Sequence, residues 1–367
     1  MITRQFLGIR NTVSGKDVPD NALTSAVDVD VNDTGVILSR NGYQKAMEAP
    51  INEAYTTFDG ATYVISENVI HLVGDDLSFK PLQNSRATEF CDFNRQLFTN
   101  DGLHIQGEVV TSLVVPTPDS IPTLALNGVG IFVPQGKYSA VYTYVKNGLE
   151  GAASQPTTID LPYDGYIGVQ FPSNPLADSA NGYLTSTNGG VFYNIDTRTE
   201  LTPANLAATD SFPVADKVEF FDSRLYCSEP YGDYTVVWYS QRFYYHLYDK
   251  VNDYFVIPGR VEAMKATQSA LIIATFNEIY AYDGISLTKL ADYGVPKGRS
   301  MVKEPLGDTV LIHTKRGICR ALPFQNLTEK KCQLPTGTVC STAIVHEKSF
   351  QKLVVLRDGD GSTFNPY

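Results

Sequence analysis

The five histidines are the first candidates for metal or acid–base chemistry. They have no HxH or HExxH spacing, so the pattern does not indicate a zinc site. Two of them lie inside apolar runs, where a buried, hydrogen-bonded histidine is commoner than a catalytic one. The GxSxG motif of serine hydrolases is absent. Carboxylate pairs for glycoside cleavage need only converge in space, and no strand end singles one out. We predict no catalytic residue, no metal site and no cofactor. The histidines are His71, His104, His246, His313 and His346.

Asp and Asn residues before Gly35 resemble a calcium-binding loop. Such a loop needs a bidentate Glu at its twelfth position, where this chain has Ser39. A hairpin turn is therefore the preferred interpretation. The residues concerned are Asp28, Asp30, Asn32 and Asp33.

An aromatic stretch at residues 236–248 is the strongest candidate for a binding surface. Trp, Tyr and Arg are enriched both in carbohydrate platforms and at protein interfaces. The alternative is that the stretch forms the core of a sheet with one exposed loop. The predicted interface residues are Trp238, Tyr239, Arg242, Phe243, Tyr244 and Tyr245.

The five cysteines are an odd number and contain no CxxC pair. This spacing favours buried free thiols in a reducing compartment over a disulfide framework or a zinc cluster. The formal net charge is −11, which disfavours a surface that grips nucleic acid. The same charge suits a wall past which DNA slides without specific binding. The N-terminus has no apolar signal region and no stretch is long enough for a membrane span, so we expect neither export by a standard signal nor membrane insertion.

The elements that would position these residues form a repeat. Its unit is an apolar strand, a short turn with Asp, Asn or Gly, and a second and third strand. Copies begin near Tyr55, Phe90, Val218, Leu271 and Thr309. The turns at Asp59 and Asn94 are 35 residues apart, and those at Gln268 and Asp308 are 40 apart. These intervals match a four-stranded propeller blade, and the apolar runs fit blades buried on both faces.

The last copy, at residues 343–357, has too few strands for a blade. A hairpin at residues 26–40 would supply the missing strands and close the ring. We therefore predict an all-β fold, a β-propeller of about six blades closed by an N-terminal hairpin. Residues 1–116 and 213–357 would form its two parts, and residues 358–367 a solvated C-terminal tail.

Residues 117–212 break the repeat. Five or so short strands follow a proline-rich linker, at roughly 8 to 12 residue spacing with turn residues between them. This pattern predicts an inserted β-sandwich module similar to fibronectin type III. Its proline-rich edges are typical of an inserted domain.

Three segments resemble the β-propeller tail and head-completion proteins of tailed bacteriophages, including tail nozzle and packaged-DNA stabilisation proteins. The first runs through residues 21–30 and 35–43, the second through 223–226 and 236–240, and the third through 290–296, 310–314 and 316–319. The resemblance covers about two thirds of the chain, and the segments that carry it contain no catalytic motif.

The resemblance implies a structural, non-enzymatic virion component assembled in the host cytoplasm. It implies a homo-oligomeric ring in the tail or neck, a nozzle, hub or stopper that lines or closes the DNA channel or joins the tail to fibres. Its partners would be other virion proteins, and the inserted module would be a docking surface for them. The alternative is a glycan-binding or glycan-cleaving propeller that acts on host-surface polysaccharide. A scaffold that shares only the fold is a third interpretation.

Overall fold

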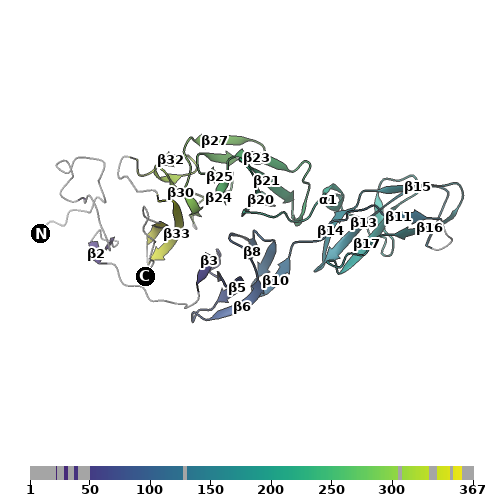
Figure 1. Cartoon of the computed structure of the whole chain (residues 1–367), viewed down its shortest axis with the longest axis horizontal. Coiled ribbons are helices and arrows are strands. Elements are labelled where there is room, and N and C mark those ends of the chain that lie inside the picture. Colours follow the sequence, from purple (N-terminus) through teal and green to yellow (C-terminus); the bar gives the residue numbers. More distant parts are fainter. Residues whose placement is uncertain are drawn as a thin grey trace. The chain divides into compact units, whose positions relative to one another are not determined.

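The computed structural model describes residues 22, 29–31, 37–39, 50–126, 130–304, 308–329, 337–347 and 350–357. The chain divides into two compact units. The first unit comprises residues 1–50, 232–235 and 257–367, and the second comprises residues 51–231 and 236–256. Almost all described elements are strands (Figure 1), so the prediction of an all-β fold is confirmed.

The second unit begins with two four-stranded antiparallel sheets, each a meander whose strands pair in chain order. Two-residue turns at Glu67-Asn68 and Asn94-Arg95 have both residues in the left-handed region, which suits the right-handed twist of the flanking strands. Ile65, Ile70 and Leu97 share one core between the two sheets. The strands are β3 (Ile51–Thr56), β4 (Thr62–Ser66), β5 (Val69–Val73), β6 (Phe79–Asn84), β7 (Phe90–Phe93), β8 (Gln96–Thr99), β9 (Leu103–Gln106) and β10 (Val109–Ser112).

A third meander follows the inserted segment and packs against the second one. The side-chain amide of Asn100 donates to the carbonyl of Ala215 at 2.8 Å, and Lys217 forms a partly buried ion pair with Glu89. Phe98 and Leu225 lie in the common core. The insertion therefore separates two sheets in sequence without separating them in space. The strands are β19 (Lys217–Phe221), β20 (Arg224–Tyr231), β21 (Tyr234–Gln241), β22 (Tyr244–Tyr248) and β23 (Tyr254–Pro258), the last paired with β21.

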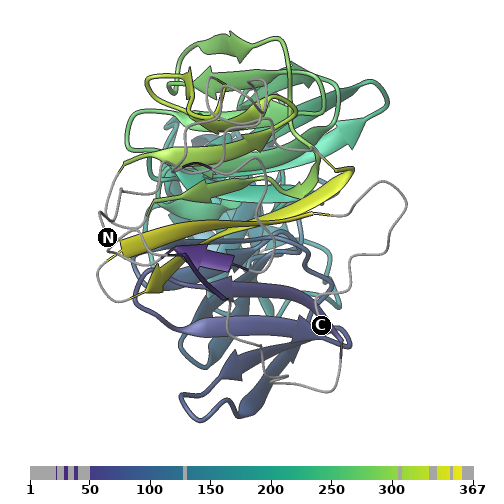
Figure 2. The ribbon, with the colours of Figure 1, turned by 90° about the vertical axis from the view of Figure 1, so that its left-hand side faces the viewer.

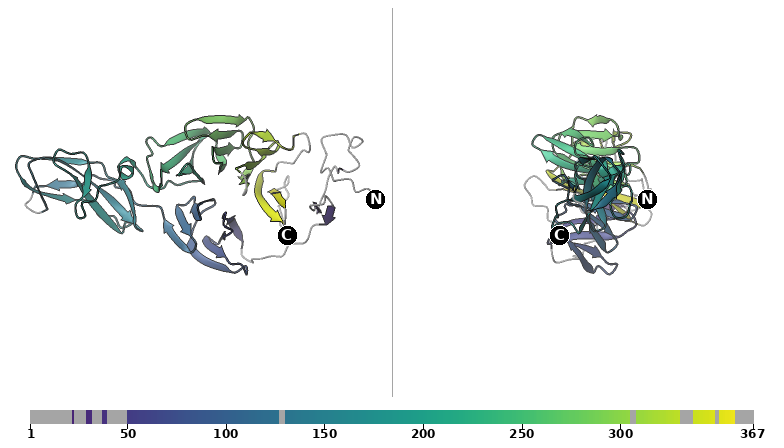
Figure 3. Two further views of the ribbon diagram at one scale, coloured as in Figure 1. Left: turned by 180° about the vertical axis from the view of Figure 1, so that it is seen from behind. Right: turned by 90° about the vertical axis from the view of Figure 1, so that its right-hand side faces the viewer.

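The inserted segment forms two sheets around a core of its own (Figure 3), which includes Tyr138, Leu161 and Ile167. In one sheet, β13 is the longest strand and pairs with β14, β15 and β17, and β18 pairs with β17. In the other, β16 pairs with both β11 and β12. The elements are β11 (Thr123–Ala125), β12 (Ile131–Val133), β13 (Gly136–Lys146), β14 (Leu149–Ala153), β15 (Thr157–Leu161), β16 (Gly165–Gln170), β17 (Ser179–Thr185), β18 (Phe192–Asn194) and the short helix α1 (Pro203–Ala207).

The first unit holds two further four-stranded meanders with a shared core that includes Ile272, Val295 and Ile312. The last two strands form a long antiparallel pair (Figure 2). The strands are β24 (Val261–Ala266), β25 (Leu271–Thr275), β26 (Ile279–Tyr282), β27 (Leu287–Ala291), β28 (Lys297–Arg299), β29 (Met301–Lys303), β30 (Val310–Thr314), β31 (Gly317–Arg320), β32 (Gln325–Asn326), β33 (Val339–Glu347) and β34 (Phe350–Arg357).

The ends of the chain bear on the predicted ring closure. β1 (Val29–Val31) and β2 (Ile37–Ser39) form the predicted hairpin, which is a two-stranded sheet. The predicted last copy, β33 and β34, forms a three-stranded sheet with β28, which pairs in parallel with β33. Closure by the N-terminal hairpin, the blade count and the boundaries at residues 116, 212 and 357 stay predictions. The predicted tail, residues 358–367, lies outside the described residues.

Candidate functional site

The predicted aromatic stretch forms β21, a tight turn and β22, and its six candidate residues divide into two groups. Trp238 and Tyr239 lie in β21 and contact their own sheet. The indole Nε1 of Trp238 donates to Glu229 Oε2 at 2.8 Å. The Arg224 guanidinium lies 5.0 Å from the centre of the Tyr239 ring. These contacts hold the side chains of Trp238 and Tyr239 against their own sheet.

Tyr245, like Trp238 and Tyr239, is partly buried. Its ring lies edge-on to Phe98, with centroids 5.3 Å apart, and edge-on to Phe220 at 5.7 Å. Phe220 in turn stacks on Phe93 at 3.8 Å. We call these four rings the aromatic ladder. The aromatic ladder joins the sheet of β7–β10 to the sheet of β19–β22.

The remaining three candidates lie on the surface at the β21–β22 turn. Phe243 is 70% exposed, has φ 65° and donates its backbone N–H to the carbonyl of Ser223 at 3.0 Å. Arg242 pairs with Asp222 of the adjacent turn, and Tyr244 is exposed. The turn therefore presents an aromatic surface held in one conformation. Its role as an interface stays a prediction.

A tyrosine between carboxylates is a group that the sequence analysis did not single out. The Tyr55 hydroxyl donates to Asp92 Oδ1 at 2.5 Å, and the backbone N–H of Phe58 donates to Asp92 Oδ2 at 3.0 Å. Burial, followed by the charges of Asp92 and Glu219, raises the pKa of Tyr55 well above its ordinary value. Tyr55 is therefore a neutral donor, and both Asp92 oxygens accept hydrogen bonds within the fold. The signal was an acid in the first strand of each sheet, but one sequence cannot show that they converge.

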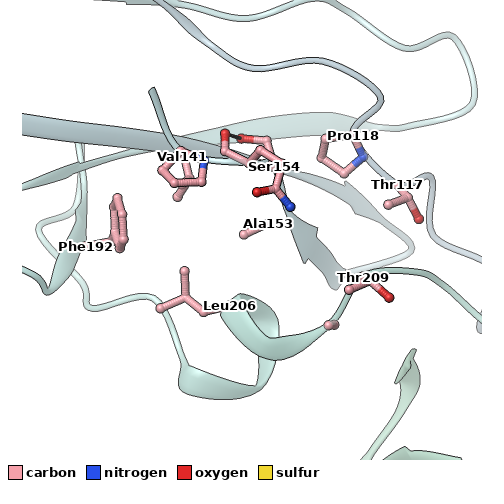
Figure 4. A pocket seen from close by; sticks show the side chains of 11 residues that line it. Thr117, Pro118, Val141, Ala153, Ser154, Phe192, Leu206 and Thr209 are labelled. Atoms are coloured by element: carbon pink, nitrogen blue, oxygen red, sulfur yellow. Dashed lines mark hydrogen bonds between the residues drawn. The ribbon is translucent and has the colours of Figure 1, made fainter. Parts of the chain in front are cut away.

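A pocket of about 310 Å³ opens in the inserted module between α1, β13, β14 and β18 (Figure 4). Its wall includes Val141, Ala153, Phe192 and Leu206. The Ser154 hydroxyl accepts from the backbone N–H of Tyr142 and donates to the carbonyl of Gln155, both at 3.1 Å. None of the lining side chains is ionisable, so the pocket offers no group for acid–base chemistry. Its wall combines apolar side chains with the hydroxyl and amide groups of Thr117, Ser154, Gln155 and Thr209.

Glu150, at the start of β14, connects the module to α1 and to β22. Its carboxylate accepts from Asn181 at 3.0 Å and from the Tyr183 hydroxyl at 2.5 Å. Its carbonyl accepts from Asn205 and lies 2.9 Å from Nε2 of His246. This arrangement anchors the inserted module to the third meander.

We expect the second unit to lose stability as the pH falls from 7.5 to 5.5. Burial lowers the pKa of His246 and of His104 below the ordinary value. The folded unit then binds fewer protons than the unfolded chain, so its stability is complete above a pH of about 6.5 and decreases below it. Urea unfolding followed by the fluorescence of Trp238, the single tryptophan, measures this. A variant with His246→Gln and His104→Gln should show a flatter pH dependence, and an unchanged slope would contradict the assignment.

Metal ligands and thiols in the part of the chain that the structure describes are the remaining candidates for chemistry. No group of three or more His, Cys, Asp or Glu residues there could hold a metal ion. Cys91, Cys227, Cys319 and Cys340 are buried and form no disulfide in that part, and Cys332 lies outside it. Burial raises the pKa of Cys227 to about 12. No described helix is long and apolar enough to cross a membrane.

Comparison with known proteins gives only distant structural similarity. No family model and no curated protein matches the chain. Virginiamycin B lyase from Staphylococcus aureus is 11% identical, with 75% of this chain and 81% of that chain covered and a TM-score of 0.33. A putative 6-phosphogluconolactonase from Bacteroides uniformis is 11% identical, with 89% and 94% covered and a TM-score of 0.35. At these values the matches bear on neither the activity nor the partners of this chain.

The class that the chain's own structure defines is therefore an all-β protein of consecutive four-stranded meanders. Such a meander is the sheet unit of β-propellers.

Proposed function

We propose that this chain is a structural component of a tailed-phage virion. It would be a β-propeller of about six blades closed by its N-terminal hairpin, with a fibronectin-III-like module inserted after β10. Copies would assemble as a ring in the tail or neck. The ring would line or close the DNA channel or connect the tail to fibres.

The proposal rests on the positions, in the fold, of the segments that resemble phage proteins. The phrase at residues 223–226 begins β20, and that at 236–240 lies in β21. The phrases at 310–314 and 316–319 cover β30 and most of β31. These segments therefore lie in equivalent hairpins of two separate meanders. A resemblance to a protein with a repeated architecture is expected to recur at equivalent places in this way. The net charge of −11 supports a channel wall that does not hold DNA.

Two surfaces support an assembly role in place of catalysis. The β21–β22 turn exposes Phe243 and Tyr244, and the module has the pocket beside Leu206. Apolar side chains of neighbouring virion proteins would bind at such places.

We expect the protein to be found in purified phage particles in a fixed number of copies per particle. The measurement is quantitative mass spectrometry of particles from an infected culture of the host, before and after separation of tails from heads. The purified chain should also form ring-shaped particles in electron microscopy. Detection in the lysate but not in the particles would contradict the proposal.

A further inference from the structure

The outer face of the β11/β12–β16 sheet carries an exposed aromatic pair that neither the core nor the proposed assembly role uses. Phe132 and Tyr166 are partners across β12 and β16, with ring centroids 5.2 Å apart and planes inclined by 65°. Phe132 is 60% exposed and Tyr166 is 44% exposed. Tyr163, in the loop that leads into β16, is 72% exposed. Exposed aromatic side chains that contact each other are candidates for an interaction site.

The register shows which residues share this face. β16 alternates, so Ile167 and Val169 face the module core while Tyr166, Gly168 and Gln170 face outward. The outward partners on the neighbouring strands are Phe132, Ala125 and Thr123. The face therefore consists of three cross-strand residue pairs: an aromatic pair, then a pair of small residues, then a polar pair. Successive pairs lie about 7 Å apart along the strand. We call this face the β16 strip.

The loop beside the β16 strip is fixed in place. Asp164 Oδ1 accepts the backbone N–H of Gln135 at 2.8 Å, which ties the loop carrying Tyr163 to the residues after β12. Gly168 and Ala125 have little or no side chain, so they leave a shallow space between the rings and the polar pair. On the β16 strip, the aromatic pair is therefore separated from the polar pair by two residues without bulky side chains.

The chemistry of the β16 strip identifies its ligand class. The six outward residues include no Asp, Glu, Lys, Arg or His, which favours an uncharged ligand. A sugar ring has a face of C–H groups that stacks on the electron-rich face of an aromatic ring. Its hydroxyls match the amide of Gln170 and the hydroxyl of Thr123, which both donate and accept. We propose that the β16 strip binds a neutral polysaccharide, so the inserted module is a glycan-binding site.

Native electrophoresis through gels containing polysaccharide tests the proposal with the full chain, since its net charge of −11 drives migration. The probes are dextran, mannan and mixed-linkage β-glucan, with acidic alginate for comparison. We expect retardation by at least one neutral polysaccharide. The double variant Phe132→Ala with Tyr166→Ala should raise the dissociation constant about tenfold or more, the effect of losing roughly 1.4 kcal/mol.

Phe58→Ala is the matched control, because it removes an aromatic ring that is 80% exposed and lies outside the module. It should leave the retardation unchanged. The double variant should stay folded and lose no more than about 1 kcal/mol of stability, the contribution of one exposed cross-strand aromatic pair. Absence of retardation in every neutral gel, equal retardation of the double variant, or retardation by alginate alone would each overturn the proposal. Loss of self-association or of a virion-protein contact in the double variant, without polysaccharide binding, would assign the strip to a protein interface and also overturn it.

Discussion

Gly294→Ala is expected to destabilise the first unit by about 2–4 kcal/mol. A Cβ on Gly294 would lie 2.6 Å from the backbone nitrogen of Asn277 and closer still to the carbonyl oxygen of Thr275. These are backbone atoms of the β25–β26 turn, so no side chain can rotate away to make room.

Hydrogen bonds on both sides hold Gly294 in this position. The backbone N–H of Val295 donates to the carbonyl of Thr275, and the N–H of Lys315 donates to the carbonyl of Gly294, both at 3.0 Å. The segment thus joins the meander of β24–β27 to that of β29–β32. Gly294 belongs to the segment at residues 290–296 that resembles phage proteins. Its physical role is to let neighbouring sheets come into close contact, because glycine has no side chain.

Urea unfolding followed by far-ultraviolet circular dichroism measures the effect. Gly190→Ala is the control, because a Cβ at Gly190 meets nothing within 4 Å, and we expect it to change stability by less than about 0.5 kcal/mol. An unchanged unfolding midpoint for Gly294→Ala would contradict this prediction. It would mean that the β25–β26 turn and the segment containing Gly294 can move apart at little cost in stability.

Phe98→Ala is expected to destabilise the second unit by about 3–5 kcal/mol. Phe98 is fully buried at the inner end of the aromatic ladder, and its ring also stacks on His104 with centroids 5.0 Å apart. Removing the ring leaves a cavity in the core shared by β7–β10 and β19–β22, two sheets that the inserted module separates in sequence.

Phe93→Ala is the graded control at the exposed end of the same ladder. Phe93 is 43% exposed and loses mainly its stacking on Phe220, so we expect a cost of about 1 kcal/mol. Trp238 packs against the same core, so its fluorescence during urea unfolding reports both variants. Equal costs for Phe98→Ala and Phe93→Ala would mean that the ladder does not join the two sheets.

Much of the local structure could be predicted because it depends on neighbouring residues. The apolar runs and their Asp, Asn and Gly turns predicted hairpins such as β7–β8 and β19–β20, and the structure has both turns in the left-handed region. The alternating pattern at residues 136–145 predicted a strand, which is β13. In these segments the turn chemistry and the period of two both act over a few residues.

The candidate site was predicted only in part, because contacts between distant residues decide exposure. The same aromatic stretch contains Trp238 and Tyr245, held in the sheet, and Phe243, at an exposed turn. Of the two interpretations of that stretch, the core of a sheet therefore applies to Trp238 and Tyr245, and an exposed surface applies to Phe243. The strands β11 and β12 were missed because each has only three residues, which is too short for a periodic signal.

The sequence by itself determined the all-β class and the hairpin repeat, and it predicted a different module between residues 117 and 212. Only the tertiary structure brought Asp92 and Glu219 close to Tyr55, formed the pocket beside Leu206 and aligned Phe132 with Tyr166. The reason is that strand and turn preferences are local. Pairing and packing join residues 34 to 164 positions apart in these three cases, and one sequence records no distances between them.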